Sequence, residues 1–439
     1  MCAMPAVQNL IQNVVVPPLA RVRCILDDDG IKDITEAVTK AMDASEVRGR
    51  LPRGGSIAIG VGSRGMSRLP ELVKATVDWF KKEGAKPFII PCMGSHGGAT
   101  AEGQAYMLKS LGITEESAGC PVRSSMDVVR LGTLERGLPV YMDALAAAAD
   151  GIFVINRVKL HTSFSGIHES GVVKMFTIGL GKQAGADSAH TLGFGAFAEI
   201  MPEMTKLILA AKKNVLGALA TVENASEVPC LVEVVMSEKL IERDRELLKY
   251  STTRMPSFPT AQLDVLILSR VGKDISGAGM DPNIIGRYST PFKSGGPSIN
   301  KIGILDISDA SKGNATGMGN ADVITRRFAG KIDYNATYAN VITATVPRSA
   351  GVPMTMDNDL DLFRCTIKNC MVEDPAKVRL LWARDTLTLD RFLVSPELLK
   401  ELENKPKCEV LGDPQPIAFD KEGNLADRDP WSQFPGETH

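Results

Sequence analysis

Short apolar runs alternate with helix-like segments along this chain of 439 residues. The run SIAIGV (56–61) is continuously apolar, which is typical of a strand buried on both faces of a sheet. Apolar residues then recur at helical spacing over 72–80, and Gly84 marks the end of that helix. Strands separated by helices indicate parallel sheets. The alternation therefore predicts an α/β fold.

The alternation continues and then restarts after a polar, proline-bearing stretch, STTRMPSFPTAQ (251–262). Before it, strands are expected over 87–92, 128–131, 139–142, 151–158 and 216–222, and helices near 101–111 and 194–212. After it, strands are expected over 263–271, 301–307 and 378–383, and helices near 319–329 and 395–404. We therefore expect two α/β domains, 1–258 and 259–439, with largely parallel sheets and an active-site cleft between them.

Composition excludes several classes of protein. The net charge of −2 offers no basic surface for nucleic acid. The eight cysteines include no C-x-x-C pair, so neither a zinc ribbon nor a disulfide framework is expected. We expect reduced thiols in a cytoplasmic protein. No uncharged apolar run approaches the ~20 residues of a membrane span. The N-terminus lacks the pattern of a signal peptide.

The chain has five histidines, and four of them lie between residues 96 and 190. His96 follows the expected strand PFIIPC, and His161 follows the expected strand GIFVINRV. Sites in open α/β sheets lie beyond the carboxyl ends of strands. A single loop histidine is usually structural, but two at strand ends of one sheet favour a site, since imidazole transfers protons near neutral pH.

A lysine and a glycine-rich stretch follow. Lys174 lies in an apolar context, where it is either an ordinary surface lysine or a group available for covalent attachment. Gly179, Gly181 and Gly185 suit a phosphate cradle, although the P-loop motif G-x-x-x-x-G-K-[ST] is absent and glycine-rich loops alone are weak evidence. H-E-x-x-H and G-x-S-x-G are also absent. His190 is a candidate metal ligand that would need further donors from a cofactor or other residues.

Two segments, VKLHTSFSGIHESGVVKMFTIGLGKQAGADSAH and GSHGGATAEG, resemble the signature of the nickel-dependent lactate racemase family. The resemblance covers most of the chain, including GSIAIGVGSRG and GAGMDPNIIGR. It implies that His96 and His161 are the paired proton-transfer groups. It also implies that Lys174 carries the cofactor through a thioamide and that His190, sixteen residues later, ligates nickel.

The cofactor that the resemblance implies is a nickel pincer nucleotide: Ni(II) with pyridinium-3-thioamide-5-thiocarboxylic acid mononucleotide. The reaction implied is racemisation or epimerisation of a 2-hydroxy acid, an isomerase activity. One histidine removes the hydroxyl proton, and the α-hydrogen leaves as hydride to the cofactor and returns to the other face. Further expected cofactor contacts are Ser63, Arg64, Gly65, Ser170 and Gly171. The N-terminal domain would hold this site, the C-terminal domain would close over it, and cofactor-assembly enzymes would be partners.

The chain also departs from the family pattern. Three extra residues separate His161 from Lys174, and His168 and Glu169 lie in that excess. Ser63 stands where the family has an aspartate. The expected substrate contacts are Arg64, Arg68, Asn283 and Arg287, of which the arginines suit a carboxylate. Two alternatives are a metal-free isomerase or lyase of hydroxy or sugar acids, and a noncatalytic cofactor-binding protein.

Overall fold

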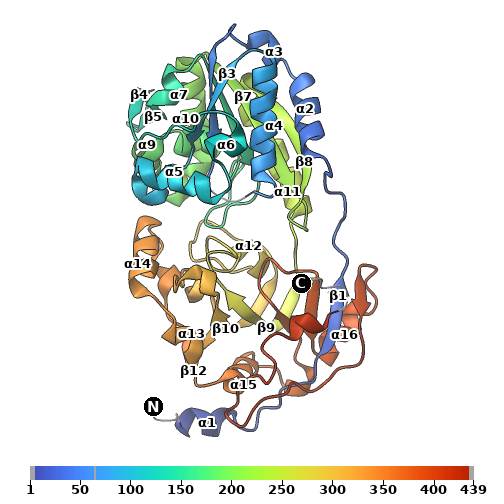
Figure 1. The fold of residues 1–439 in the computed structure, drawn as a ribbon. Helices are drawn as coiled ribbons and strands as arrows, with labels where there is room; N and C mark the ends of the chain where they lie inside the picture. The colour runs from blue at the N-terminus through green and yellow to red at the C-terminus, as the bar shows by residue number, and fades with distance from the viewer. Residues whose placement is uncertain (1–4, 64–65, 435–439) are drawn as a thin grey trace. The chain divides into compact units, whose positions relative to one another are not determined.

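The computed structural model describes residues 5–63 and 66–434, which form two compact units (Figure 1). One unit is Asp27–Met255, and the other combines Met1–Leu26 with Pro256–His439. Each contains one large, mostly parallel sheet with helices packed on it, so the predicted α/β class is confirmed.

The N-terminal segment departs from the predicted division at residue 258. Strand β1 (Ala20–Cys24) pairs antiparallel with β14 (Arg391–Val394) on one side and with β15 (Cys408–Val410) on the other. Its backbone hydrogen bonds therefore place the first residues in the C-terminal unit. The short helix α1 (Pro5–Ile11) precedes β1, and Ile11 is part of the core of the same unit.

The unit Asp27–Met255 is built on a five-stranded sheet. Its strands, in spatial order, are β3 (Lys86–Pro91), β2 (Ser56–Val61), β6 (Gly151–Arg157), β7 (Val215–Glu223) and β8 (Pro229–Met236). The first four are parallel to one another, and β8 is antiparallel. Gly60 of β2 lies opposite Ile90 and Val154. The predicted strands over 56–61, 87–92, 151–158 and 216–222 are thereby confirmed.

Helices with one apolar face cover this sheet. In α4 (Leu69–Lys82), Leu72, Val73, Val77 and Phe80 are fully buried, and α2 (Ile34–Asp43) packs beside it (Figure 1). Phe80 meets Phe153 of β6 edge-on, with 5.3 Å between ring centroids. The other helices are α3 (Val47–Arg50), α5 (Ala101–Ser110), α6 (Glu115–Ala118), α7 (Ala144–Ala148), α10 (Phe197–Ala211) and α11 (Leu240–Arg254).

Two segments of this unit differ from the prediction. Strands β4 (Val128–Thr133) and β5 (Pro139–Asp143) form a separate antiparallel pair and do not join the main sheet. The glycine-rich stretch is helical, running through α8 (Val172–Lys174), the π-helix η2 (Met175–Gly179) and α9 (Lys182–His190). A side chain at Gly179 would come within 2.6 Å of the Cys92 sulfur, so this glycine permits close packing rather than an open cradle.

The other unit contains an eight-stranded sheet. Strands β12 (Met354–Met356), β11 (Val323–Thr325), β10 (Ser298–Ile307), β9 (Gln262–Val271) and β13 (Leu380–Ala383) are parallel, and β14, β1 and β15 extend the sheet antiparallel. Its helices are α12 (Pro282–Ile285), α13 (Arg326–Gly330), α14 (Tyr334–Thr343), α15 (Asp359–Asn369) and α16 (Pro396–Leu402). The helix predicted near 319–329 is wrong over β11, and the helical parts of this range are the 3-10 turn η6 (Met318–Asn320) and α13. A short β-branched run at 323–325 fits a buried strand.

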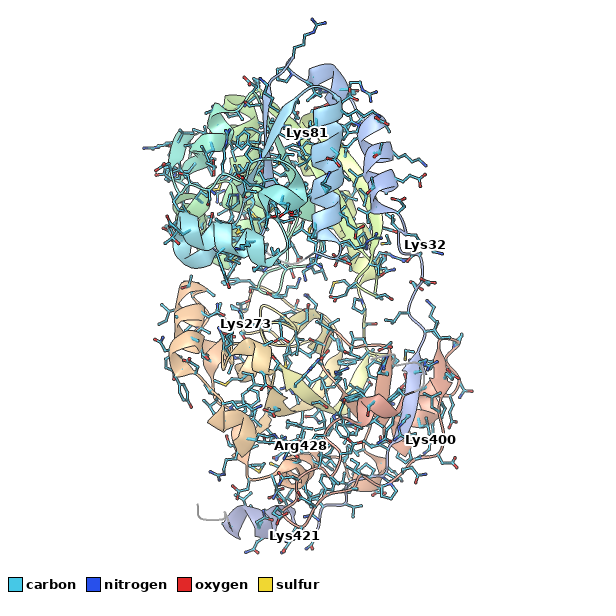
Figure 2. The ribbon with its side chains drawn as sticks, viewed as in Figure 1. Lys32, Lys81, Lys273, Lys400, Lys421 and Arg428 are labelled. Carbon is cyan, nitrogen blue, oxygen red and sulfur yellow. The ribbon has the colours of Figure 1, made fainter. Side chains whose placement is uncertain are left out.

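Basic side chains are labelled on both units in Figure 2. Lys32 and Lys81 belong to the unit Asp27–Met255, and Lys273, Lys400, Lys421 and Arg428 belong to the other. The ammonium of Lys273 donates to the Gly277 carbonyl at 2.5 Å and to Asn340 Oδ1 at 2.6 Å, which closes the loop after β9. Within residues 5–63 and 66–434, no helix has both the length and the apolar character to cross a membrane.

Candidate active site

Three neighbouring parallel strands end beside the residues that the sequence singled out. Ser63 follows β2, His96 follows β3 and His161 follows β6, and these strands are adjacent in the order β3-β2-β6. Parallel strands present their carboxyl ends at one edge of a sheet, so the three loops share that edge. The parallel alternation in the sequence predicted this arrangement.

His96 and Ser63 are in direct contact. The Ser63 hydroxyl and His96 Nδ1 form a short hydrogen bond between the loops after β2 and β3. The His96 side chain is exposed, whereas Met93 and Gly94 beneath it are buried. Gly94 has a φ of +58°, a left-handed conformation that favours glycine, and its N–H donates to the Gly179 carbonyl at 3.2 Å. The loop that carries His96 is therefore anchored on η2.

His161 is held by its own loop. Its backbone N–H donates to Glu169 Oε2 at 2.6 Å, and the Gly166 N–H donates to Glu169 Oε1 at 3.2 Å. The Ser163 N–H donates to His161 Nδ1 at 3.0 Å. Because Nδ1 accepts this hydrogen bond, the neutral ring carries its proton on Nε2. Glu169, in the excess of three residues, is thus a buried carboxylate that closes the loop.

An aromatic cluster joins His161 to His190. Phe194 lies 5.8 Å from the His161 ring and 5.2 Å from the His190 ring, measured between centroids. Phe164 lies 4.5 Å from His161, and Phe197 lies 4.8 Å from His190. The three phenylalanines also contact one another and are buried. The structure therefore brings His161 and His190 against one apolar wall, which the sequence reasoning missed.

Lys174 ends α8, and His190 ends α9. Burial lowers the pKa of His190, the nearby Lys174 ammonium lowers it further, and Asp187 opposes these effects. His190 Nδ1 is buried and finds no hydrogen-bond partner in the described part of the chain. A neutral imidazole with an unpaired buried nitrogen has the protonation state that a metal ligand needs. The unpaired nitrogen of His190 thus fits a ligand role, whereas the attachment role expected of Lys174 stays a prediction.

His168 is placed quite differently from His96 and His161. Its Nδ1 lies 2.8 Å from Asp244 Oδ2, and both side chains are 1% exposed. The other Asp244 oxygen accepts the N–H groups of Val172 at 2.7 Å and Val173 at 3.4 Å. Asp244 thereby caps α8, the helix that ends at Lys174. His168 supports this cap and does not line the edge of the sheet.

Two expected cofactor contacts have structural explanations. A side chain at Gly171 would come within 2.1 Å of Asp244 Oδ1, so glycine is required where α8 meets its cap. The Gly171 carbonyl also accepts a hydrogen bond from the Asn156 amide at 2.8 Å. Ser170 forms an isolated antiparallel bridge with Lys159 through two backbone hydrogen bonds. Of the other three expected contacts, Ser63 bonds His96 as described above, and Arg64 and Gly65 lie outside the described residues.

Arg68 is occupied by protein acceptors. Its guanidinium makes two hydrogen bonds to Glu71, at 2.8 and 2.5 Å. It donates two more to the carbonyls of Ile31 at 3.1 Å and Lys32 at 2.8 Å. Arg68 also has a φ of 56° at the start of α4. Arg68 thus links the start of α4 to the segment before α2 through hydrogen bonds.

Arg287 is likewise occupied, in the other unit. It pairs with Asp322 at 2.6 Å and donates to the carbonyls of Asn320, Ile299 and Asn300. The backbone N–H and side-chain amide of Asn283 both donate to Asp281 Oδ1, at the start of α12. Both residues organise the turn between β9 and β10.

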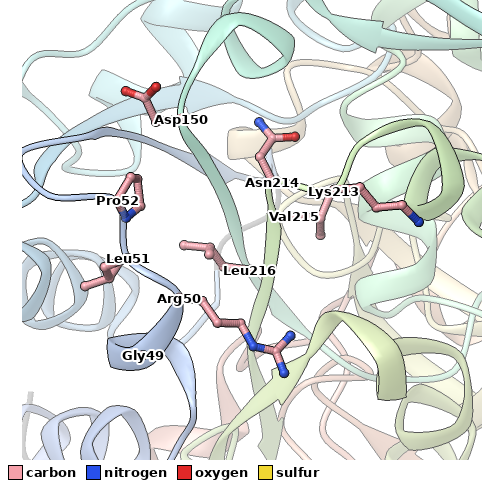
Figure 3. A pocket seen from close by; sticks show the side chains of 9 residues that line it. All are labelled: Gly49, Arg50, Leu51, Pro52, Asp150, Lys213, Asn214, Val215 and Leu216. Carbon is pink, nitrogen blue, oxygen red and sulfur yellow. The ribbon is translucent and has the colours of Figure 1, made fainter.

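No group of three or more histidine, cysteine, aspartate or glutamate side chains is gathered for a metal ion within residues 5–63 and 66–434. One histidine cannot hold a metal ion by itself, so the source of the further donors that His190 needs, a cofactor or other residues, stays a prediction. A separate hollow of about 510 Å³ is lined by residues including Arg50, Asp150 and Lys213 (Figure 3). Asp150 and Leu216 lie at the amino ends of β6 and β7, so this hollow is at the opposite edge of the sheet from the histidines.

Comparisons with known proteins add little to this geometry. No family model matches the chain, and no curated protein matches it. Among solved structures, the lactate racemase apoprotein from Thermoanaerobacterium thermosaccharolyticum matches with a TM-score of 0.45 and 14% sequence identity. The match covers 84% of this chain and 88% of the other. A likeness at this level identifies neither an activity nor a site residue for this chain.

Proposed function

We propose that the chain is a racemase or epimerase of a 2-hydroxy acid that works with a nickel pincer nucleotide. One observation carries the proposal: His190 has a buried, unpaired Nδ1 within the described residues and a pKa that burial and Lys174 lower. A neutral imidazole is a good ligand for Ni(II), and one that lies near a lysine suits a cofactor bound through both.

The site residues have separate roles in this proposal. Lys174 would attach the cofactor, and His190 would ligate its nickel. When bound, this group supplies the acceptor and donor for the two-electron step at the α-carbon. His96 and His161 would exchange the proton of the substrate hydroxyl, one for each configuration, since the two hydroxyls point in different directions. His96 is oriented by Ser63, and His161 by Ser163 and its aromatic neighbours.

The carboxylate of the substrate would be held by Arg64. Arg68 and Arg287 are the other arginines that the sequence suggested, and both guanidinium groups are already engaged by carboxylates and carbonyls. A bidentate contact to a substrate would require these bonds to break.

The test is a chirality assay on protein produced together with the cofactor-assembly enzymes, over lactate, malate, longer aliphatic and aromatic 2-hydroxy acids and aldonates. We expect His96→Gln and His161→Gln each to lose about 10²–10⁴-fold in turnover, the usual contribution of a general acid–base group. His190→Gln should lose nickel. Lys213→Ala, in the hollow at the opposite sheet edge, should change neither the turnover nor the nickel content. Full turnover without nickel would instead favour a metal-free isomerase or lyase.

A further inference from the structure

A fully buried polar network lies beneath the loop that carries His96. Lys182, Asp143 and Gln104 are each 0% exposed. The Lys182 ammonium lies 2.9 Å from Asp143 Oδ2, and it donates to the Pro91 carbonyl at 2.6 Å and to Gln104 Oε1 at 3.2 Å. The ammonium therefore makes two hydrogen bonds and one close ion pair, in which Asp143 Oδ2 accepts no hydrogen bond within the described residues.

Gln104 connects this network to the loop that carries His96 through hydrogen bonds. Its amide nitrogen donates to the Gly94 carbonyl at 2.9 Å and to the His96 carbonyl at 3.1 Å. The side-chain amide thus uses its oxygen for Lys182 and both of its N–H groups for the loop backbone. Pro91, the last residue of β3, precedes the same loop, so Lys182 reaches the loop at both ends.

Lys182 is also the first residue of α9, the helix that ends at His190. Its φ is 53°, a left-handed conformation that is unfavourable for a residue with a side chain. The network therefore connects the start of the helix that carries His190 to the loop that carries His96. The surrounding contacts hold Lys182 in an unfavourable backbone conformation, which is common near functional sites.

Stability alone does not explain this ion pair. A buried ion pair is often no more stabilising than apolar residues of the same volume, because both charges lose their hydration. Here the polar groups donate to the backbone carbonyls of Pro91, Gly94 and His96, at the two ends of one loop. The network therefore determines the path of one loop.

We infer that Lys182 is a positioning residue for His96: its buried ammonium, acting through Gln104, fixes the backbone of the loop that holds His96 against Ser63. The effect of this positioning on turnover rests on the function proposed above. The positioning itself is measurable without a substrate, because the chain has only five histidines and their ring nitrogens can be followed by NMR.

The first variant is Gln104→Met, which removes the donors to Gly94 and His96 and leaves Lys182 with Asp143 and Pro91. Amide exchange over 94–100 should rise about tenfold or more, since both hydrogen bonds from Gln104 to the loop carbonyls are lost. The ring ¹⁵N shifts of His96 should change from values typical of a single tautomer to values averaged over both tautomers. The ring ¹⁵N shifts of His161 and His168 should stay unchanged. Thr76→Val, which removes a buried hydroxyl in α4, is the matched control and should leave His96 unchanged.

The second variant tests Lys182 itself. Lys182→Met combined with Asp143→Asn removes both charges and keeps the oxygen that caps α7 through the Ala146 N–H. We expect the same change at His96 although Gln104 is retained. In a protein with 2-hydroxy-acid activity, either variant should lower kcat by about tenfold or more with KM within about threefold, as misplacement of a reacting group does.

Unchanged His96 signals and exchange in a folded Gln104→Met protein would overturn the inference, whether or not the double variant folds. Changed His96 signals in the variants, together with no racemisation by the wild-type protein, would instead reject the proposed function and leave the positioning intact.

Discussion

His168 and Asp244 form a buried pair in which Nδ1 lies 2.8 Å from Oδ2, 76 residues away in the sequence. The second oxygen of Asp244 accepts the N–H groups at the start of α8. This pair makes the short helix that ends at Lys174 depend on α11. A three-residue helix has almost no stability of its own, so its position depends on such contacts.

Removal of the carboxylate should therefore be costly. We expect Asp244→Ala to lower the free energy of unfolding by about 3–5 kcal/mol, the usual effect of deleting one partner of a buried, hydrogen-bonded charge. Urea unfolding would measure it, with Lys249→Ala on the exposed side of α11 as the control. His168→Ala should also destabilise, since it leaves Asp244 Oδ2 unpaired. Equal stability of Asp244→Ala and the control would contradict the capping role.

His190 should make the stability of the unit pH-dependent in protein prepared without metal. Its folded pKa lies below the unfolded value of 6.5, chiefly through burial and then through Lys174. As the pH falls below about 6.5, the unfolded state therefore binds more protons at this histidine than the folded state does. The free energy of unfolding that neutral His190 contributes is fully present above that pH and is lost on acidification. Urea unfolding at pH 7.5 and 5.5 should show a smaller difference in His190→Gln than in wild type. A difference of the same size would assign the dependence to other groups.

The charge of Lys174 should be detectable at His190 without any cofactor. In Lys174→Met, the pKa of His190 should rise, because a neighbouring positive charge no longer opposes protonation. Histidine NMR titration measures this directly. Asp187→Asn should shift the same pKa downward, since Asp187 raises it. If both variants move it in the same direction, the two charges do not act on His190 as the structure indicates.

Much of the candidate site could be predicted because it depends on strand ends. Ser63, His96 and His161 each follow an apolar run, and parallel strands collect such positions at one edge. Asp244 and Phe194 could not be predicted, because their partners are set by tertiary packing and neither lies in a recognisable motif. The glycine-rich stretch suggested a phosphate cradle but is helical, and the sequence does not reveal that Gly179 packs on Cys92. Strand β1 is short and charged, and only its pairing with β14 and β15 makes it a strand.

Lysine variants of the three candidate arginines should differ in whether they change KM or the melting temperature. Arg64→Lys should raise KM by about 10–100-fold, since a charge-assisted contact is worth roughly 1.5–3 kcal/mol and lysine cannot make a bidentate one. Arg68→Lys and Arg287→Lys should instead lower the melting temperature, because they break contacts to Glu71 and Asp322. A wild-type KM in Arg64→Lys with a raised KM in Arg68→Lys would transfer the carboxylate contact to Arg68.

Phe194 offers the most direct test of whether His161 and His190 share one environment. Its ring contacts both imidazoles, and it is 8% exposed. Phe194→Ala should cost about 3–5 kcal/mol of unfolding free energy through the cavity it leaves. It should also shift the ring signals of His161 and His190 together, because both lose the same aromatic neighbour. Phe153→Leu, at a fully buried position of β6, should destabilise the unit without moving either signal. A shift of only one histidine in Phe194→Ala would show that the aromatic wall does not connect them.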